Sequence, residues 1–454
     1  MELNVVILAA GQGKRMHSRR PKVLQPLAGR PLLGHVIDTA RNLRAASVCV
    51  VYGHGGDAVR EAFPDDDLTW ALQAEQLGTG HAVMQAMPDV RDDARILILF
   101  GDVPLLTPST LQKLLDDCPE RDLGVLTVDV VDPTGYGRIV REDGRILRNV
   151  EHKDATEAER EIREINTGVM CAPARKLRGW LDRIRNDNSQ GEYYLTDVIG
   201  MAVHDGVDVH GIKAADEEEV MGINDRRQLA AAERAFQQKI VDALLQQGVS
   251  FADPARVDVR GTLTCGSDVF IDVNAVFEGD VALGDNVTIE SNNLLRDSRI
   301  GPGTVVHSNC HIEGAITGEG CEIGPFSRLR PGAELAADVK IGNFVEIKKS
   351  VVADGSKVNH LTYIGDTDIG RGVNVGAGTI TCNYDGANKH RTVIGDDAFI
   401  GSGVELVAPV EIGAGAVIGA GSTISKDAPA GKLTVARVRQ TTIENWKRPQ
   451  KKPK

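Results

Sequence analysis

The second half of the chain repeats with a period of six residues. An aliphatic residue occurs at every sixth position from Ile394 to Ile424, and glycine usually follows it. Further residues that suit an interior stand four positions later, as Val345 does after Ile341. In extended chain, residues an even number of positions apart face the same side, so both would point inward. Such a repeat indicates a parallel β-helix of hexapeptides, whose coils must stack because one coil cannot bury its own interior.

The repeat is interrupted between Thr379 and Gly395. The interrupting segment, 381–393, is polar and contains Asn383 and Tyr384. We expect it to loop out of its coil, so that its side chains can contact a ligand that regular strands do not reach.

The first half has a different pattern. Apolar runs at 5–10, 47–53 and 95–102 resemble buried parallel strands, and helical patterns such as 31–43 lie between them. This alternation predicts an α/β domain with helices on both faces of a mostly parallel sheet. Ligands of such sheets bind beyond the carboxyl ends of the strands.

A long helix is predicted between the halves. Residues 226–247 contain neither glycine nor proline, and Gly248 would end the helix. We therefore expect a domain at 1–225, a connector helix at 226–248 and a second domain at 249–454.

Composition excludes several classes of protein. The net charge of -12 argues against a nucleic-acid partner, and no apolar run approaches the ~20 residues of a membrane span. The seven cysteines are scattered without a CxxC pair, which predicts neither a disulfide framework nor a zinc site and fits a reducing cytoplasm. The basic tail, 447–454, is either a solvated terminus or a contact for a phosphorylated ligand.

A glycine-containing loop at 8–16 follows the first predicted strand. Glycines there let backbone N–H groups approach a phosphate, and Arg15 and Lys22 add positive charge. The loop is not a P-loop and lacks the third glycine of a dinucleotide-binding motif. A second stretch, 53–58, matches that motif only loosely.

Asp102 ends the strand predicted at 95–102. Its carboxylate could hold Mg²⁺ against phosphates or could cap a turn. The motif alone leaves both roles open.

Ordered motifs along nearly the whole chain resemble those of a known family. In the first half they are LAAGQGKRMHSRRPKVL, LQAEQLGTGHA, GDVPLL, DPTGYGRI, EHKDAT, EINTGV and GEYYLTD. In the second half they are IGPFSRLRPGAEL, GNFVEIKKS, NHLTYIGD and VNVGAGTITCNYDGANKH. Together they resemble the bacterial bifunctional N-acetylglucosamine-1-phosphate uridylyltransferase and glucosamine-1-phosphate N-acetyltransferase family.

The resemblance implies two linked reactions. The second domain would acetylate glucosamine 1-phosphate with acetyl-CoA, and the first would join the product to UTP with Mg²⁺, releasing pyrophosphate. The sugar nucleotide would feed peptidoglycan and lipid A synthesis in the cytoplasm. The implied fold is a Rossmann-like nucleotidyltransferase domain and a left-handed parallel β-helix, assembled as a homotrimer. The usual crossover rule would give the opposite hand.

The resemblance also implies the residues of the uridylyltransferase site. Arg15 and Lys22 would act on phosphates, Gln73 would read uracil, and Asp102 and Asn224 would bind Mg²⁺. Asn224 could instead cap the connector helix, as could Asp225. The full set of nucleotide and sugar contacts is Leu8, Ala9, Ala10, Gly11, Lys22, Gln73, Gly78, Thr79, Phe100, Gly101, Asp102, Gly137, Glu151, Asn166 and Asn224.

For acetyl transfer the resemblance makes His360 the general base. Glu346, on a neighbouring hexad, could orient the imidazole or the amine. Apart from the resemblance, a lone histidine is more often structural than catalytic, and the outer face of a solenoid is normally polar. The implied sugar-phosphate contacts are Arg330, Lys348, Tyr363 and Asn374. The implied acetyl-CoA contacts are Ala377, Asn383, Tyr384, Ser402, Ala420 and Arg437, in a site shared between subunits.

The chain departs from the family pattern at three positions. Lys14 stands where the family usually has a small hydroxyl residue, Phe100 where tyrosine is common, and Arg439 where proline is common. Lys14 would add a charge facing the triphosphate.

Two rival interpretations remain from the sequence. A nucleotidyltransferase could use a β-helix only for assembly or regulation, but it would not need His360, the interrupting loop and Arg437. A non-catalytic hexapeptide scaffold would not need the phosphate loop and Asp102.

Overall fold

A computed structural model describes residues 1–11, 13–53 and 56–451. Parts of the glycine loop at 8–16, of the stretch 53–58 and of the basic tail therefore lie outside the described residues. Internal contacts divide the chain into two compact units, Met1–Phe236 and Gln237–Lys454. Each unit is described separately.

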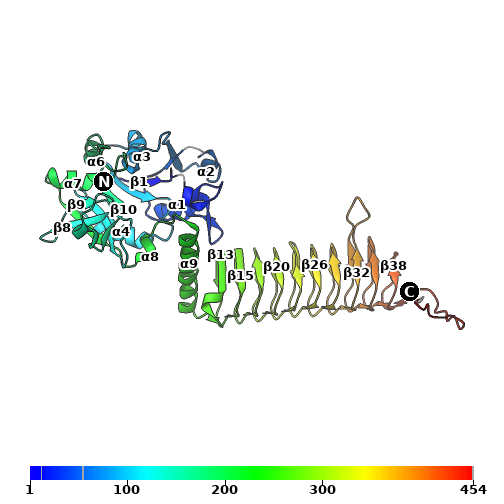
Figure 1. Ribbon diagram of the computed structural model, residues 1–454. Coiled ribbons are helices and arrows are strands. Elements are labelled where there is room, and N and C mark those ends of the chain that lie inside the picture. Colours follow the sequence, from blue (N-terminus) through cyan, green and yellow to red (C-terminus); the bar gives the residue numbers. More distant parts are fainter. Residues whose placement is uncertain (12, 54–55, 452–454) are drawn as a thin grey trace. The chain divides into compact units, whose positions relative to one another are not determined.

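The first unit is built on a mixed, mostly parallel sheet (Figure 1). Strand β1 lies at its centre between β6 and β4, parallel to both, and β10 joins the other side of β6 in the antiparallel direction. The strands in spatial order are β11 (Val209–Lys213), β7 (Leu123–Asp129), β10 (Glu164–Pro173), β6 (Arg95–Phe100), β1 (Leu3–Leu8), β4 (Ser47–Tyr52) and β5 (Leu68–Leu72). A hairpin of β8 (Arg138–Glu142) and β9 (Arg145–Val150) pairs with β10.

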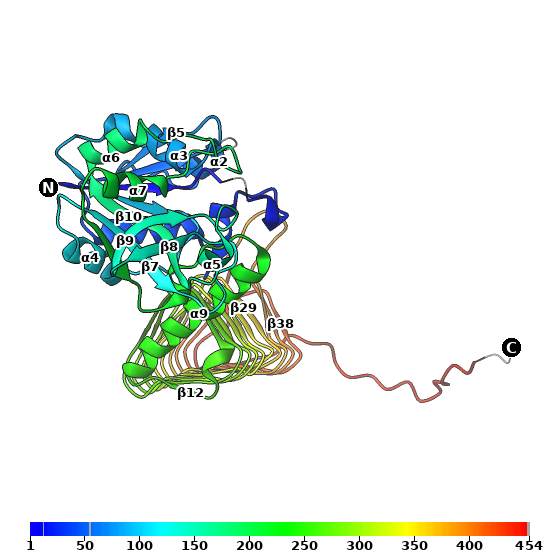
Figure 2. The same cartoon turned by 60° about the vertical axis from the view of Figure 1, so that its left-hand side comes forward.

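Helices cover both faces of this sheet, as the sequence predicted. One apolar cluster packs α1 (Leu32–Asn42) and α4 (Pro108–Asp117) against the strands. The other packs α3 (Thr79–Ala86), α6 (Ala174–Leu181) and α7 (Asp197–His204) against the opposite face. Figure 2 shows α3 and α6 on one side of the strands and α4 on the other.

The predicted connector is α9, Arg226–Gln246, and Gly248 follows it with φ of +97°. Its first half belongs to the first unit, where Ala232 and Phe236 pack with Leu27 and Leu32. Its second half belongs to the second unit, so the division between the units falls inside the helix.

The second unit is a parallel β-helix, as predicted. Figure 2 views it nearly along the coil stack, and the coils superimpose as a triangle. One face is a continuous parallel sheet of β12 (Ser250–Phe251), β14 (Phe270–Ile271), β16 (Thr288–Ile289), β19 (Val305–Val306), β22 (Glu322–Ile323), β25 (Lys340–Asn343), β28 (Lys357–His360), β31 (Asn374–Val375), β34 (Phe399–Ile400), β37 (Val417–Ile418) and β39 (Leu433–Thr434). A second parallel sheet runs from β13 (Val257–Cys265) to β38 (Thr423–Ile424) and includes β23 (Arg328–Leu329), β26 (Glu346–Lys348), β29 (Tyr363–Gly365), β32 (Ile380–Cys382) and β33 (Thr392–Ile394). The left hand of the helix stays a prediction from the family.

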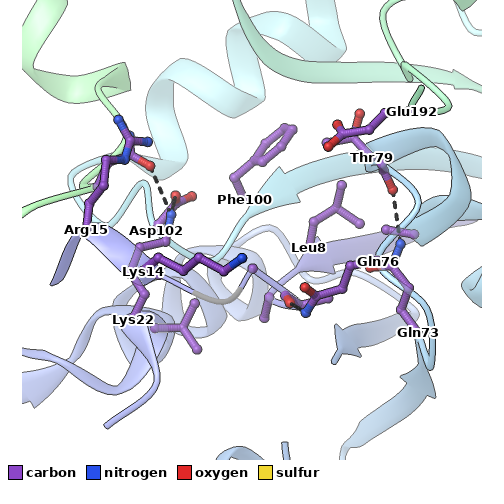
Figure 3. Close-up of a pocket in the computed structure, with 18 residues that line it drawn as sticks. Leu8, Lys14, Arg15, Lys22, Gln73, Gln76, Thr79, Phe100, Asp102 and Glu192 are labelled. Atoms are coloured by element: carbon purple, nitrogen blue, oxygen red, sulfur yellow. Dashed lines mark hydrogen bonds and ion pairs between the residues drawn. The ribbon is translucent and has the colours of Figure 1, made fainter. Parts of the chain in front are cut away.

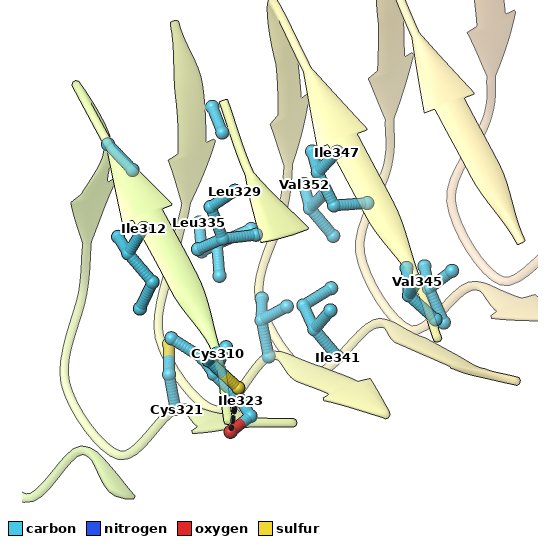
Figure 4. Packing of buried hydrophobic residues seen from close by; sticks show 14 of the residues in the cluster. Cys310, Ile312, Cys321, Ile323, Leu329, Leu335, Ile341, Val345, Ile347 and Val352 are labelled. Atoms are coloured by element: carbon cyan, nitrogen blue, oxygen red, sulfur yellow. Dashed lines mark hydrogen bonds between the residues drawn. The ribbon is translucent and has the colours of Figure 1, made fainter. Parts of the chain in front are cut away.

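The interior of the β-helix is a stack of aliphatic side chains. Ile312, Leu329, Ile347 and Ile364 occupy matching positions in successive coils, and each is fully buried. Figure 4 shows part of this packing, including Ile312, Leu329 and Ile347. The low aromatic content, 4%, suits this narrow core.

The interruption in the repeat lengthens a single step of the ladder. Lys340 pairs with Lys357, 17 positions later, and Phe399 pairs with Val417, 18 positions later. Asn374 pairs with Phe399, 25 positions later, and the ladder is kept. Figure 1 shows the extra chain projecting beside β32. Because β32 and β33 extend into the interrupting segment, the projecting part is 383–391, narrower than the expected 381–393.

The end of the β-helix where β13 lies has an edge strand whose polar groups need partners. The buried Gln237 of α9 supplies them: its Nε2 donates to Val259 O at 2.8 Å, and Val259 N donates to its Oε1 at 2.7 Å. The neighbouring Gln238 donates instead to the exposed Asp242 at 2.8 Å.

Gln237→Leu should therefore destabilise the second unit. Two buried backbone groups of Val259 would lose their partners, which lowers the free energy of unfolding by about 1–3 kcal/mol. Urea unfolding of the full chain followed by circular dichroism measures this. The matched control, Gln238→Leu, should change stability by less than about 0.5 kcal/mol. Equal effects of the two substitutions would contradict the capping role of Gln237.

Among the residues that the structure describes, no helix combines the length and the apolar composition needed to cross a membrane.

Candidate active sites

A cavity of about 750 Å³ opens in the first unit where β1 and β6 end (Figure 3). This is the edge of the sheet where the sequence placed a nucleotide site. Of the predicted contacts, the cavity is lined by Leu8, Ala9, Ala10, Gly11, Arg15, Lys22, Gln73, Gly78, Thr79, Phe100, Asp102 and Asn224. It is also lined by Gly13 of the predicted phosphate loop and by Lys14, which was expected to face the triphosphate. Four further lining residues, Val23, Gln76, Ala82 and Glu192, were not predicted.

Lys22 joins the two predicted metal ligands. Its ammonium contacts the Asp102 carboxylate and donates to Asn224 Oδ1 at 3.2 Å. Ile223 N donates to Asp102 O at 2.9 Å, which ties the segment before α9 to the end of β6. Asp102 and Asn224, far apart in sequence, thus present oxygens to one cation.

The structure settles which residue caps α9. Asp225 Oδ1 accepts from the backbone N–H groups of Arg227 and Gln228, both at 2.9 Å. Asp225 is therefore the cap, and the Asn224 side chain faces the cavity.

The oxygens of Asp102 and Asn224 fit Mg²⁺. Carboxylate and amide oxygens are hard ligands, and here they already surround an ammonium group. Mg²⁺ commonly takes one or two protein ligands and completes its shell with water and substrate phosphates. Within the described part of the chain, no group of three or more His, Cys, Asp or Glu side chains forms a fuller metal site.

The other end of the cavity is held by side-chain amides. Gln73 is buried and donates to Gly78 O at 3.0 Å, while Gln76 donates to Ala10 O and joins two loops of the cavity wall. Gly78 has φ of +110°, and a Cβ there would lie 2.7 Å from Tyr193 O. Only glycine therefore fits at this position of the cavity wall.

The predicted sugar contacts gather around β8, β9 and β10. Asn166 N donates to Gly137 O at 3.0 Å. Glu151 Oε1 accepts from Asn149 Nδ2 at 2.9 Å and from Thr196 Oγ1 at 3.0 Å. Within the described residues, Asn149 Oδ1 and Asn166 Nδ2 are buried without a hydrogen-bond partner. Buried amide atoms normally have partners, so this pair fits a polar ligand such as a sugar.

A groove of about 490 Å³ crosses β28, β31, β34 and β37 of the second unit. It brings together five predicted residues, namely His360, Asn374, Ala377, Ser402 and Ala420. Arg437 Nη1 donates to Ala420 O at 2.6 Å, which places this arginine next to the groove.

The His360 imidazole is oriented by Asn343. Asn343 and His360 are partners in the ladder, and Asn343 Oδ1 accepts from His360 Nδ1 at 2.9 Å. With its proton on Nδ1, the neutral ring has Nε2 available to accept another proton. This is the tautomer that a general base requires.

Three of the predicted sugar-phosphate contacts, Arg330, Lys348 and Tyr363, lie around the corner from His360, in or next to strands of the other sheet. Leu361 turns the chain with φ of +50°, and Tyr363 begins the next face. Glu346 accepts from Arg330 Nη1 at 2.8 Å, which raises the pKa of Arg330. Since Glu346 contacts Arg330 and Asn343 contacts the imidazole, Asn343 is the residue that orients His360. A role for Glu346 toward the amine stays a prediction.

The projecting loop contacts this second group of residues. Asn383 Nδ2 donates to the Asp366 carboxylate, whose Oδ2 lies 3.9 Å from Lys348 Nζ. The Lys389 ammonium beside Lys348, and then burial, lower the pKa of Lys348. Asn383 and Tyr384 do not line the groove, so their role toward acetyl-CoA stays a prediction.

Comparison with known proteins covers the whole chain. Residues 5–165 match the MobA-like NTP transferase domain, and residues 391–426 match the bacterial transferase hexapeptide (six repeats). The protein named "Bifunctional protein GlmU" of Herminiimonas arsenicoxydans is 58% identical over 449 residues, covering 99% of both chains. Proteins of the same name from Azoarcus sp. (strain BH72) and Acinetobacter baumannii (strain ACICU) are 57% and 55% identical, covering 99% of this chain and 100% and 99% of theirs.

The chain belongs to the GlmU family. It is a bifunctional transferase with a nucleotidyltransferase part and a hexapeptide acyltransferase part. The resemblance drawn from the ordered motifs is confirmed, and the two rival interpretations, a single-activity nucleotidyltransferase and a non-catalytic scaffold, are wrong.

Sequence reasoning missed several residues of both sites. Asn149 stands two positions before Glu151, so the period of a strand would have put both on one face. Lys389 lies in the polar segment that interrupts the repeat, and its charge there could have indicated contact with an anionic ligand. The contacts of Asn343, Asp366 and Thr196 carry no local signal, because they depend on coil stacking and on the packing of distant segments.

The departures at Lys14 and Phe100 both fall on the nucleotide cavity. The Lys14 side chain is exposed and extends into the cavity (Figure 3), where it adds positive charge beside Arg15. Phe100 packs against the Gly168 backbone, where a Cβ would lie 2.5 Å from its ring. Arg439 is exposed, and nothing in the structure explains its presence.

Proposed function

We propose that the chain makes UDP-N-acetylglucosamine in two reactions. It transfers the acetyl group of acetyl-CoA to glucosamine 1-phosphate, and then transfers UMP from UTP to N-acetylglucosamine 1-phosphate with release of pyrophosphate. The observation that carries this proposal is the presence of two separate sets of residues, one in each unit. The product would feed peptidoglycan and lipid A synthesis.

Each of the two reactions is assigned to its own domain. We assign uridylyl transfer to 1–225 and acetyl transfer to 249–454, with the connector helix at 226–248. The first half of α9 packs on the first unit, so a stable uridylyltransferase fragment should extend to Phe236.

In uridylyl transfer, an oxygen of the sugar phosphate attacks the α-phosphorus of UTP. The protein's part is positioning and charge neutralisation. The loop after β1, with Arg15 and Lys22, binds the phosphates, and Gln73 binds uracil. Gly101, whose N–H donates to Leu8 O at 2.9 Å, holds the loop against β6. Mg²⁺, bound by Asp102 and Asn224, would neutralise charge on the phosphate oxygens.

The acetylated sugar is bound by Gly137, Glu151 and Asn166. The buried, unpartnered amide atoms of Asn149 and Asn166 would hydrogen-bond its hydroxyl or acetamido groups. These contacts place the attacking phosphate oxygen toward the nucleotide.

Asp102→Ala should abolish pyrophosphate formation and leave thiol release from acetyl-CoA nearly unchanged. The substitution removes a ligand of Mg²⁺ and the counter-charge of Lys22. Parallel assays of pyrophosphate and free thiol measure the two reactions. Chelation of Mg²⁺ should have the same selective effect on the wild-type chain. Loss of both activities in a folded variant would contradict two separate sites.

In acetyl transfer, the amine nitrogen of the sugar attacks the thioester carbonyl while His360 Nε2 takes a proton from the amine. The thiolate of CoA then leaves, and the proton on His360 passes to the thiolate, giving the free thiol, or to solvent. Arg330, Lys348, Tyr363 and Asn374 bind the sugar phosphate, and Lys389 adds a second ammonium group beside Lys348.

Acetyl-CoA would lie along the groove below His360. The small side chains of Ala377, Ser402 and Ala420 leave room for an extended ligand. Arg437 would bind the phosphates of CoA, with Asn383 and Tyr384 completing the site.

His360→Ala should reduce thiol release by about 10²- to 10⁴-fold, the usual effect of removing a general base. Pyrophosphate formation from N-acetylglucosamine 1-phosphate and UTP should be unchanged, because the residue lies in the other unit. Thiol release within a few-fold of the wild-type rate would show that another residue is the base.

We propose that the chain is a cytoplasmic homotrimer associated through the β-helix. Phe326, Phe344 and Leu361 project from successive turns at one corner, and each is more than half exposed. The rings of Phe326 and Phe344 stack with centroids 5.3 Å apart. An exposed apolar ridge of this kind is typical of an association surface. A monomeric full chain in sedimentation equilibrium would contradict this proposal.

A further inference from the structure

The projecting segment 383–391 has a defined shape. Tyr384 and Lys389 form an antiparallel bridge, and His390 N donates to Asn383 O at 2.8 Å. Asp385 N donates to Asn388 O at 3.1 Å. The segment is thus a short hairpin, which we call the projecting hairpin.

The Asp385 carboxylate holds the tip of this hairpin. Its Oδ1 accepts from Ala387 N at 2.8 Å and from Asn388 N at 2.6 Å. Its Oδ2 accepts from His390 Nε2 at 2.7 Å. The Asn388 N–H, then the His390 side chain, hold the pKa of Asp385 well below its usual range. One ionised side chain therefore joins both strands of the hairpin.

Both strands of the hairpin contact the groups around Lys348. On one strand, Asn383 donates to Asp366, whose carboxylate lies 3.9 Å from Lys348 Nζ. On the other, Lys389 lies close enough to lower the pKa of Lys348. Two ammonium groups repel one another, so their proximity is favourable chiefly when an anion lies between them. Phosphate, with several acceptor oxygens, suits such a pair.

The position of Lys389 is fixed through the hairpin. Lys389 directly precedes His390, the residue that Asp385 holds. Arg391, which follows, is anchored to Asp368 of the neighbouring coil. Between the tip and this anchor, the backbone of Lys389 has little freedom, which limits the positions that its ammonium can reach.

We propose that Asp385 is a positioning residue for the phosphate of the amino-sugar substrate in acetyl transfer. It shapes the projecting hairpin so that Lys389 stands beside Lys348 before the substrate binds. The inference rests on the acetyltransferase function proposed above and assigns Asp385 and His390 a part in it. Asp385 does not touch the reacting atoms, so its loss should weaken substrate binding more than it slows the chemical step.

Steady-state kinetics of thiol release test this. Asp385→Ala should raise KM for glucosamine 1-phosphate about tenfold, equivalent to one lost charge-assisted contact, with kcat and the KM for acetyl-CoA within about twofold of wild type. Asp385→Asn keeps an oxygen that can accept from Ala387 and Asn388, so it should restore part of the affinity. Inorganic phosphate, used as a competitive inhibitor, should bind Asp385→Ala about tenfold more weakly.

Asp396→Ala is the matched control. Asp396 Oδ1 also accepts from a backbone N–H, that of Arg371 at 2.8 Å, and Oδ2 from the Arg371 side chain at 3.4 Å, but it lies outside the hairpin. Its KM values should match those of wild type. Urea unfolding followed by circular dichroism checks that the β-helix of every variant is folded.

A wild-type KM for glucosamine 1-phosphate in Asp385→Ala, or a loss confined to kcat, would overturn the positioning role. That result is distinct from a failure of the proposed function, in which the wild-type chain itself would release no thiol with glucosamine 1-phosphate.

Discussion

The second unit depends on the parallel backbone ladder that joins each coil to the next. Because the ladder fixes which residues stand above one another, it aligns the aliphatic side chains that fill the interior. The same ladder places Asn343 beside His360 and aligns the strands that carry the groove. Seven or so extra residues can leave one coil only because pairing resumes unchanged at Phe399. The functional loop is thus an insertion that the ladder tolerates without a break.

Charge is arranged in a similar way in the two units. In the first, Lys22 is held by Asp102 and Asn224 at the mouth of a cavity where Arg15 and Lys14 are exposed. In the second, Lys348 and Lys389 stand together close to Asp366. Each site therefore has cations placed to meet an anionic ligand. The proposed ligands of these cations are both phosphorylated, UTP in the first unit and glucosamine 1-phosphate in the second, which accounts for this common feature.

Much of the fold was predictable from the sequence because the patterns that indicate it lie within short stretches of the chain. A period of six marks the β-helix, and apolar runs separated by helical patterns mark the α/β sheet. The antiparallel strand β10 was not predicted, because a buried strand has the same apolar pattern whether it runs parallel or antiparallel to its neighbours. The ordered motifs identified most of the residues that line the cavity and five of those that line the groove. Contacts between coils could not be predicted from local sequence, because the step from one coil to the next is 17 residues in some places and 18 in others, and 17 is not a multiple of six. For the same reason Asn343 was not predicted as the partner of the His360 imidazole, whereas Glu346, expected to orient the imidazole or the amine, contacts Arg330.

The central claim is that one chain carries two reactions in sequence, the first of which supplies the substrate of the second. The most direct measurement follows free thiol and pyrophosphate together, with glucosamine 1-phosphate as the sole sugar and with UTP and Mg²⁺ present throughout. Without acetyl-CoA, pyrophosphate should form slowly or not at all. On addition of acetyl-CoA, thiol should appear first, and pyrophosphate should follow after a lag. Pyrophosphate formation at the same rate with and without acetyl-CoA would contradict the account.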